Sequence, residues 1–498
     1  MSKRQFNDDI WYNVVRFLSP EDLRQANSCH HVLFEEWMRY RYTSVKFLDR
    51  DGSIRLLEHL CDTDSTAAAY IRKVEIRPWL VQPLAHSIDS SVKFPNLLQS
   101  SRSSKAAKER IQKQVNEDVF WVNAAFRKMP NVVEYSIDWD GSFRYHRELY
   151  QACLTAGLDG WSDNLIKLTV KVPPAMLNSF VGIELPKLQS FNWHLYTGSL
   201  SPKEINMATD GFMVFLNNLK DSLRSLCIVS THSSHDLDLS RIFRKMGRFP
   251  LLSKIALTLP ADGQHLSEPA TFVRFLEKHR SSLEEISLRS GSAPSCNQLA
   301  NSGKVLDRED RNRSLNLLSM QSSLPHLRVF SRFMDRQCSK LKEMSFLSAR
   351  AVLVNKAGGG QITDWILQLA EDINIPFPQL RSLSVSMFLS GACSDPRVRL
   401  VHLHCPTLDS LSLVDFALSH DDILSILRPS PIRAETLLQI STLSLRIHRF
   451  SSQLLIDLAL LLPELKTARI ECNTVVSVLL RILQGTSTKC YVDSLVGY

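Results

Sequence analysis

Few residues in this 498-residue chain have types and a spacing that could do chemistry. The segment His402-Leu403-His404-Cys405 offers metal-ligating side chains, and alternate residues would share a face if it forms a strand. No acid or further histidine completes a ligand set there, and Cys29-His30-His31 is equally isolated in the sequence. The sequence therefore predicts no metal site at either position.

Nucleotide and nucleophile motifs give no stronger signal. Gly358-Gly359-Gly360 lacks the Lys-Ser or Lys-Thr pair that completes a phosphate-binding loop, and no Gly-x-Gly-x-x-Gly accompanies a strand. A Gly-x-Ser-x-Gly nucleophile turn is also missing from the sequence. We therefore expect a non-catalytic protein without a cofactor. An enzyme whose active site lies in an insertion is the remaining alternative, and it would need a converging polar set.

Composition indicates a folded protein that stays inside the cell. Hydrophobic residues make up 44% and charged residues 22%, and no apolar run approaches the roughly 18 residues that a membrane helix needs. The chain opens on a polar segment without a signal core, and its ten cysteines have no Cys-x-x-Cys spacing. The net charge of +8 is dispersed. We expect no membrane or nucleic-acid partner and a cytoplasmic or nuclear location.

One phrase recurs along the chain: Pro or Ser shortly before Leu, then two residues, an apolar residue, any residue, and another apolar residue. Its clearest copies are 186–193, 378–385 and 406–413. Looser copies start at Val132, Leu165, Leu223, Leu252, Leu283, Leu341, Ile440 and Leu465. With one hidden copy between Leu283 and Leu341, the period is about 30 residues, which is typical of leucine-rich repeats.

Helical periodicity separates these strand phrases. The expected helices cover 115–129, 205–219, 272–279, 363–373, 421–427 and 454–462. A strand and a helix per repeat predict an α/β solenoid over 49–498, with a curved parallel sheet and helices on its convex side. Polar or glycine-rich stretches at 86–113, 289–314 and 354–361 interrupt the rhythm and are expected to be loop insertions.

A helical domain is expected in front of the repeats, over residues 1–48. Ile10, Val14 and Leu18 recur at helical spacing. Ser19-Pro20 then combines an N-cap residue with a proline tolerated at the first helical position, so a second helix begins there.

The quoted residues resemble an F-box. The resemblance rests on Phe6 to Ile10, on Phe17-Leu18-Ser19-Pro20-Glu21-Asp22-Leu23, on Ser28 to His31 and on Tyr40 to Phe47. With the repeats, it points to F-box proteins with degenerate leucine-rich repeats, of the type abundant in fungi. It implies that an apolar surface of these helices binds a Skp-type adaptor, which is linked to a cullin scaffold. The residues that we predict to form this surface are Ile10, Val14, Leu18, Pro20 and Leu23. Alternatively, these helices only cap the first repeat.

The open face of the solenoid is the expected surface for a protein substrate. Within each phrase, the residue between the last two apolar positions points away from the core, because strand side chains alternate. The predicted groove consists of Ser136, Thr169, Asn192, Ser287, Ser345, Ser384, Ser412, Ser444, Arg446 and Arg469.

The resemblance and the repeats together predict the substrate-recognition subunit of a Skp/cullin/F-box ubiquitin ligase. Such a subunit does no bond chemistry and brings a substrate near an enzyme that other subunits deliver. The alternative is a leucine-rich-repeat adaptor or scaffold without ubiquitin-ligase association.

Overall fold

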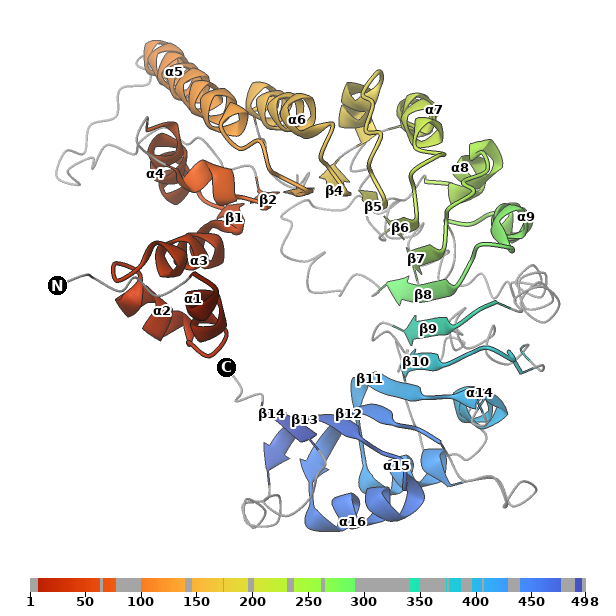
Figure 1. Ribbon diagram of the computed structural model, residues 1–498. Coiled ribbons are helices and arrows are strands. Elements are labelled where there is room, and N and C mark those ends of the chain that lie inside the picture. The colour runs from red at the N-terminus through yellow and green to blue at the C-terminus, as the bar shows by residue number, and fades with distance from the viewer. Residues whose placement is uncertain are drawn as a thin grey trace, which may run out of the picture. The chain divides into compact units, whose positions relative to one another are not determined.

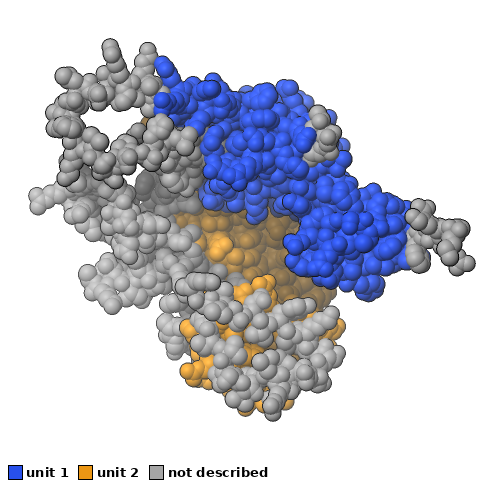
Figure 2. Space-filling view, turned by 90° about the vertical axis from the view of Figure 1, so that its left-hand side faces the viewer, with its two compact units in different colours: residues 1–199, 206–223 blue, residues 200–205, 224–498 orange. Residues whose placement is uncertain are grey.

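The computed structural model describes most of the chain, and it falls into two compact units. Unit 1 comprises residues 1–199 and 206–223, and unit 2 comprises 200–205 and 224–498 (Figure 2). The described residues are 8–62, 66–77, 100–138, 146–172, 174–195, 201–230, 237–260, 265–291, 340–348, 373, 376–386, 396–404, 407–428, 439–475 and 489–494.

Three short helices begin unit 1: α1 (Asp8–Val15), α2 (Pro20–Ala26) and α3 (His31–Tyr42). The Ser19 hydroxyl accepts a hydrogen bond from the Asp22 N–H, while the Asp22 carboxylate accepts one from the Ser19 N–H. This reciprocal capping box fixes the start of α2. The predicted helix, stop and new helix are therefore confirmed, and both α1 and α2 pack against α3.

Parallel strands follow in unit 1, each paired with the next in chain order. They are β1 (Ser44–Phe47), β2 (Lys73–Ile76), β3 (Glu134–Asp138), β4 (Lys167–Val172) and β5 (Ser190–Leu195). The helices and 3-10 turns between or after them are α4 (Arg50–Cys61), η1 (Ala67–Tyr70), α5 (Ser100–Arg127), α6 (Arg147–Trp161), η2 (Pro174–Phe180) and α7 (Pro202–Asn218). Helices α5 and α6 lie along one side of β3 and β4 (Figure 1).

Unit 2 repeats this plan, again with each parallel strand paired to the next. Its strands are β6 (Ser225–Ser230), β7 (Lys254–Pro260), β8 (Glu285–Gly291), β9 (Glu343–Ser348), β10 (Ser382–Ser386), β11 (Ser410–Leu418), β12 (Thr442–Phe450), β13 (Thr467–Val475) and β14 (Lys489–Ser494). Its described helices are α8 (Leu239–Lys245), α9 (Pro269–His279), α14 (Pro396–His404), α15 (His420–Leu427) and α16 (Ser452–Leu461).

The core of each unit lies between the strands and their helices. In β4 and β5 every second residue is buried, and the residues between them are half-buried on the other side, which we call the open face. A helix is about 10 Å across whereas paired strands lie about 4.8 Å apart, so stacking such repeats bends the sheet toward its open face. The predicted fold class, an α/β solenoid of the leucine-rich-repeat kind behind a helical segment, is confirmed.

Three repeat strands escape the sequence prediction: β1, β2 and β14. Ser44–Phe47, which the prediction places in the helical domain, forms β1 and pairs in register with β2 (Lys73–Ile76). The change from helices to repeats therefore lies between α3 and β1, before the predicted boundary at residue 48, and it differs from the division between the two compact units.

The hidden repeat between Leu283 and Leu341 is a wrong expectation. Strand β8 pairs directly with β9, with Ser287 opposite Ser345, so no strand lies between them in the sheet. The expectation of a hidden copy depends on a constant repeat length. Parallel pairing only requires that the chain return to the edge of the preceding strand, and the connection between the two strands can have any length.

The expected loop at 86–113 is also partly wrong, because residues 100–113 belong to α5. This stretch includes Lys105-Ala106-Ala107-Lys108-Glu109-Arg110, all strong helix formers, and it extends the amphipathic helix predicted from residue 115. Residues 289–291 belong to β8. The rest of the expected insertions, 86–99, 292–314 and 354–361, and the expected helix at 363–372 lie outside the described residues.

A buried ion pair joins α4 to α5 in unit 1. The Arg50 guanidinium donates two hydrogen bonds to Asp118, with Nη2 at 2.9 Å from Oδ1 and Nε at 3.2 Å from Oδ2. The Asp118 side chain is 1% exposed, so the guanidinium compensates a charge that has almost no contact with water.

A histidine at the end of a helix supports the turn before a strand in two repeats of unit 2. His279 Nε2 accepts a hydrogen bond of 2.9 Å from the Phe249 N–H, and His404 Nδ1 accepts one of 3.2 Å from the Phe377 N–H. Each phenylalanine precedes a proline and a strand. His402 and His404 do not share a strand face, because both lie on α14 and each hydrogen-bonds to backbone.

His404 makes the stability of unit 2 depend on pH. Burial lowers its pKa to about 4, whereas an unfolded histidine titrates near 6.5. Between these values the unfolded chain binds more protons, so the free energy of unfolding falls as pH falls. We expect a loss of about 2 kcal/mol between pH 7 and 4.5 from this group.

The control is His404→Gln, whose side-chain oxygen can still accept from the Phe377 N–H but does not titrate. Urea unfolding at the two pH values measures the effect. Equal pH dependence in the wild type and in this variant would contradict the assignment.

Among the described residues, no helix is long and apolar enough to cross a membrane.

Candidate protein-interaction surfaces

Exposed large apolar side chains concentrate in the first three helices. Residues 8–42 hold five of the fourteen such side chains in the described part of the chain: Ile10, Tyr12, Phe17, Phe34 and Tyr40. Helix α1 has no buried residue at all. The helical segment therefore presents more apolar surface to solvent than its own packing explains.

An apolar ridge runs along α1 and the turn that follows it. The Phe17 N–H bonds the Val14 carbonyl, so the chain keeps a helical turn beyond the end of α1. Ile10, Val14 and Phe17 then follow one another at steps of four and three residues on one side of this helix. We call these three residues the α1 ridge. Ile10 is 48% and Phe17 88% exposed, while Val14 is half-buried.

The five predicted adaptor-binding residues differ in exposure. Ile10 and Pro20 are exposed, and Val14 and Leu18 are half-buried. Leu23 is only 6% exposed and belongs to the core of the helical segment, so it supports the surface from beneath. Phe17 was missed as a surface residue, although it opens the Phe-Leu-Ser-Pro phrase and lies seven residues after Ile10.

The open face of unit 1 carries a ladder of alternating charges. Glu134 on β3 lies between Lys73 on β2 and Lys167 on β4, at 2.9 and 3.8 Å. Asp138 on β3 likewise pairs with Arg77 and Lys171, at 3.5 and 3.0 Å. These pairs largely neutralise one another across the strands.

The predicted groove residues of unit 1 lie in a row between these charges. Ser136, Thr169 and Asn192 are in register on β3, β4 and β5, and Asn192 Nδ2 donates a 3.2 Å hydrogen bond to Thr169 Oγ1. His194 ends the charged row. Burial lowers its pKa, nearby Lys171 lowers it further, and Asp138 opposes them, so His194 is neutral at pH 7.

Unit 2 continues the row of small polar side chains as an unbroken run of serines. Ser287, Ser345, Ser384, Ser412 and Ser444 occupy the same register position on the five successive strands β8 to β12. All are half-buried on the open face. We call them the serine row. Their small side chains leave the backbone of the sheet accessible to a partner.

Two arginines border one end of the serine row. Arg469 on β13 is opposite Ser444, and its guanidinium lies 3.2 Å from Glu471. Arg446 on β12 is half-buried, and its Nε atom is buried without a hydrogen-bond partner among the described residues. A guanidinium on the open face can pair with a carboxylate or phosphate on an approaching chain.

Two thiols of the repeats, those of Cys153 and Cys227, offer little nucleophilic chemistry. Burial raises the pKa of Cys153, in the core, and that of Cys227, on the open face of β6. Lys254 only partly opposes the effect at Cys227. Both side chains are therefore protonated at neutral pH and unreactive as thiolates.

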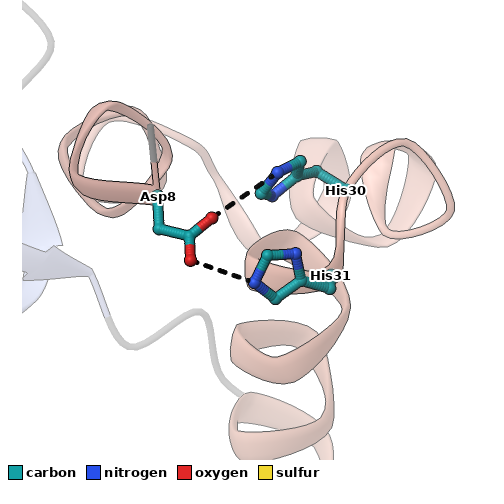
Figure 3. A group of neighbouring side chains, drawn as sticks. All are labelled: Asp8, His30 and His31. Atoms are coloured by element: carbon teal, nitrogen blue, oxygen red, sulfur yellow. Dashed lines mark ion pairs between the residues drawn. The ribbon is translucent and has the colours of Figure 1, made fainter. Parts of the chain in front are cut away.

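A cluster of Asp8, His30 and His31 lies where α1 meets the start of α3 (Figure 3). Asp8 Oδ1 is 3.8 Å from His30 Nε2, and Asp8 Oδ2 is 3.3 Å from His31 Nε2. The expectation that no acid accompanies these histidines is therefore wrong. The sequence separates Asp8 from His30 by a whole helix and two turns, and only the packing of α1 on α3 brings them together.

Comparisons with known proteins add a likeness of fold. No protein-family model matches the chain, and no curated protein matches it. Among solved structures, the chain is similar to the crystal structure of the Rad7 and Elc1 complex in yeast, with 12% identity, a TM-score of 0.37 and coverage of 75% of this chain and 77% of that chain. Values this low carry no inference about function. By its own architecture, the chain is a leucine-rich-repeat-like α/β solenoid behind an N-terminal helical segment.

Proposed function

We propose that this chain is the substrate-recognition subunit of a Skp/cullin/F-box ubiquitin ligase. The observation that carries the proposal is the succession of two different surfaces on one chain. An exposed apolar ridge on capped N-terminal helices comes first, and a solenoid with a polar open face follows.

The N-terminal helices would bind a Skp-type adaptor. The α1 ridge supplies apolar contact area, and burying a Phe or Ile side chain is worth roughly 1.5–3 kcal/mol. Pro20 follows Phe17 by three residues, at the start of α2, where the capping box holds the backbone in place. The adaptor is named on the resemblance of this segment to an F-box, and it would connect the chain to a cullin scaffold.

The open face would hold a protein substrate. The serine row gives a shallow hydroxyl-lined surface that can approach an extended chain closely, and Arg446 at its end offers a charge for an acidic group. The subunit contributes no covalent chemistry of its own. It raises the effective concentration of a substrate lysine near a ubiquitin-charged enzyme that other subunits supply.

A repeat scaffold without ligase association is the second candidate. It is supported by the finding that no family model matches the N-terminal helices. These helices nevertheless have the pattern of the F-box resemblance, in which one helix ends and a second begins at Pro20. In that case α1, α2 and α3 serve only as the cap of the first repeat, at β1.

Co-expression of the full chain with a Skp-type adaptor separates these two candidates. The proposal expects a stable complex that survives affinity purification and gel filtration. If the chain is folded and soluble but never retains the adaptor, the proposal is contradicted and the repeat scaffold is the remaining candidate.

The two surfaces can be tested in one crossed experiment. Ser384→Arg with Ser412→Arg fills the middle of the serine row with bulky cations, so it is expected to reduce substrate capture and leave adaptor binding unchanged. An α1-ridge variant is expected to do the reverse. Quantitative mass spectrometry of purified complexes, with the proteasome inhibited, measures both. Loss of adaptor from the serine-row variant would contradict the division of roles.

A further inference from the structure

The cluster of Asp8, His30 and His31 has the composition of a metal site. Each residue offers one ligand atom, and these atoms all lie within 4.8 Å of one another. Asp8 is the first residue of α1, His30 is the N-cap of α3 and His31 is the first residue of α3 (Figure 3). The three side chains converge from two helices on one small volume.

Their spacing suits an ion between them better than direct hydrogen bonds. An N–H···O bond joins heavy atoms at about 2.7–3.2 Å, whereas the two His Nε2 atoms lie 3.8 and 3.3 Å from the Asp8 carboxylate. Tetrahedral zinc with bonds of about 2.0–2.1 Å places its ligand atoms about 3.3 Å apart. The distance from His31 Nε2 to Asp8 Oδ2 equals that edge length, and His30 Nε2 lies 3.8 Å from Oδ1, the other oxygen of the same carboxylate.

We propose that Asp8, His30 and His31 bind a divalent transition-metal ion of the zinc class, with water in the fourth position. Imidazole nitrogen and carboxylate oxygen are preferred ligands of Zn²⁺. Trp11 stacks on the His30 ring, with centroids 4.8 Å apart and an interplanar angle of 19°. This contact holds the ring of the half-buried histidine in the orientation that faces Asp8.

Metal binding competes with the cap of α3. His30 Nδ1 accepts a 3.3 Å hydrogen bond from the Val32 N–H, so in the metal-free protein the ring proton of a neutral His30 lies on Nε2. An ion at Nε2 needs the lone pair there and the proton on Nδ1, which ends the bond from Val32. We therefore expect micromolar rather than nanomolar affinity.

The ion would join α1 to α3. Helix α1 has no buried residue, so few apolar contacts hold it in place. A metal bridge between its first residue and the start of α3 would restrain the helix that carries the α1 ridge. This inference stands on the ligand geometry and does not depend on an adaptor.

Calorimetric titration of the full chain with ZnCl₂, in buffer freed of metal, tests the site. The ligand variants are Asp8→Asn, His31→Gln and His30→Asn. Asparagine is itself a good N-cap residue, so His30→Asn keeps an acceptor for the Val32 N–H while removing the ligand. Each variant is expected to lose one zinc equivalent or to bind it at least tenfold more weakly. Zinc should also raise the melting temperature of the wild type.

Two control variants complete the design. His420→Gln alters another histidine paired with an acid, His420 with Asp457 at 2.8 Å, and it is expected to bind zinc like the wild type. Cys29→Ser, at the neighbouring exposed thiol, is expected to do the same. Asp8 and His31 are 52% and 60% exposed, so their variants should fold, which circular dichroism checks.

The proposal is overturned if the ligand variants bind as much zinc, as tightly, as the wild type. It is equally overturned if Cys29→Ser alone removes the zinc equivalent, because the ligand set would then be a different one.

Discussion

Phe17→Asp is expected to remove a Skp-type adaptor from the purified chain without unfolding it. The Phe17 side chain is 88% exposed, so the substitution takes nothing from the core of the helical segment. In a complex, the same position would place an unpaired carboxylate in an apolar contact, where it costs several kcal/mol. We expect the adaptor Kd to rise at least 100-fold, as measured by surface plasmon resonance.

Leu460→Asp is the matched control. Leu460 on α16 is also a highly exposed apolar residue, at 72%, but it lies in unit 2. It is expected to retain the wild-type adaptor affinity. Leu23 is unsuitable for such a test because its side chain is buried, and a charge there would disturb the helices themselves. If Phe17→Asp bound the adaptor as tightly as the wild type, the α1 ridge would not be the docking surface.

Asp118→Ala is expected to lower the free energy of unfolding of unit 1 by about 3 kcal/mol. The substitution leaves the Arg50 guanidinium, which is 29% exposed, without the carboxylate that accepts two of its hydrogen bonds. It also opens a polar cavity between α4 and α5. Urea unfolding followed by circular dichroism measures the loss.

The double variant Arg50→Met with Asp118→Leu separates the charge from the packing. Replacing a buried ion pair with apolar side chains of similar volume is often neutral, so much of the lost stability should return. Wild-type stability in Asp118→Ala would contradict the role of the pair. A double variant no more stable than Asp118→Ala would show that packing rather than charge accounts for the loss.

The repeat strands were predictable because their apolar residues alternate with a fixed phase. Leu380, Leu383 and Val385, taken from one clear copy of the phrase, are all fully buried in unit 2. The same phase predicted which residues point the other way, and the five serines of the serine row are indeed neighbours in register. Their role in binding stays a prediction.

The exposed apolar residues of the N-terminal helices were harder to predict, because the apolar stripe that a helix buries is broad and its edges are not marked in the sequence. Phe17 and Leu23 both fit the apolar pattern, yet one is almost fully exposed and the other is buried. A period of 3.6 residues cannot tell the side that meets α3 from the side that meets solvent. That choice depends on the packing of α1 and α2 against α3.

Proximity between distant residues was the least predictable part. His402 and His404 are two residues apart, as residues on one face of a strand would be, but both lie on helix α14 and each ring hydrogen-bonds to backbone. Asp8 and His30 come together only because α1 packs against α3. Neither arrangement leaves a local pattern in the sequence.

The direct pairing of β8 with β9 has a consequence for how this chain can change in evolution. Glu285 pairs with Glu343, 58 positions later, whereas Lys254 pairs with Glu285 after only 31. Closing a connection of twice the length costs only about 0.6 kcal/mol, because the entropy of closure grows with the logarithm of length. Joins between strands can therefore gain or lose whole segments with little penalty. Insertions in the connections between strands can therefore accumulate while the serine row keeps its register.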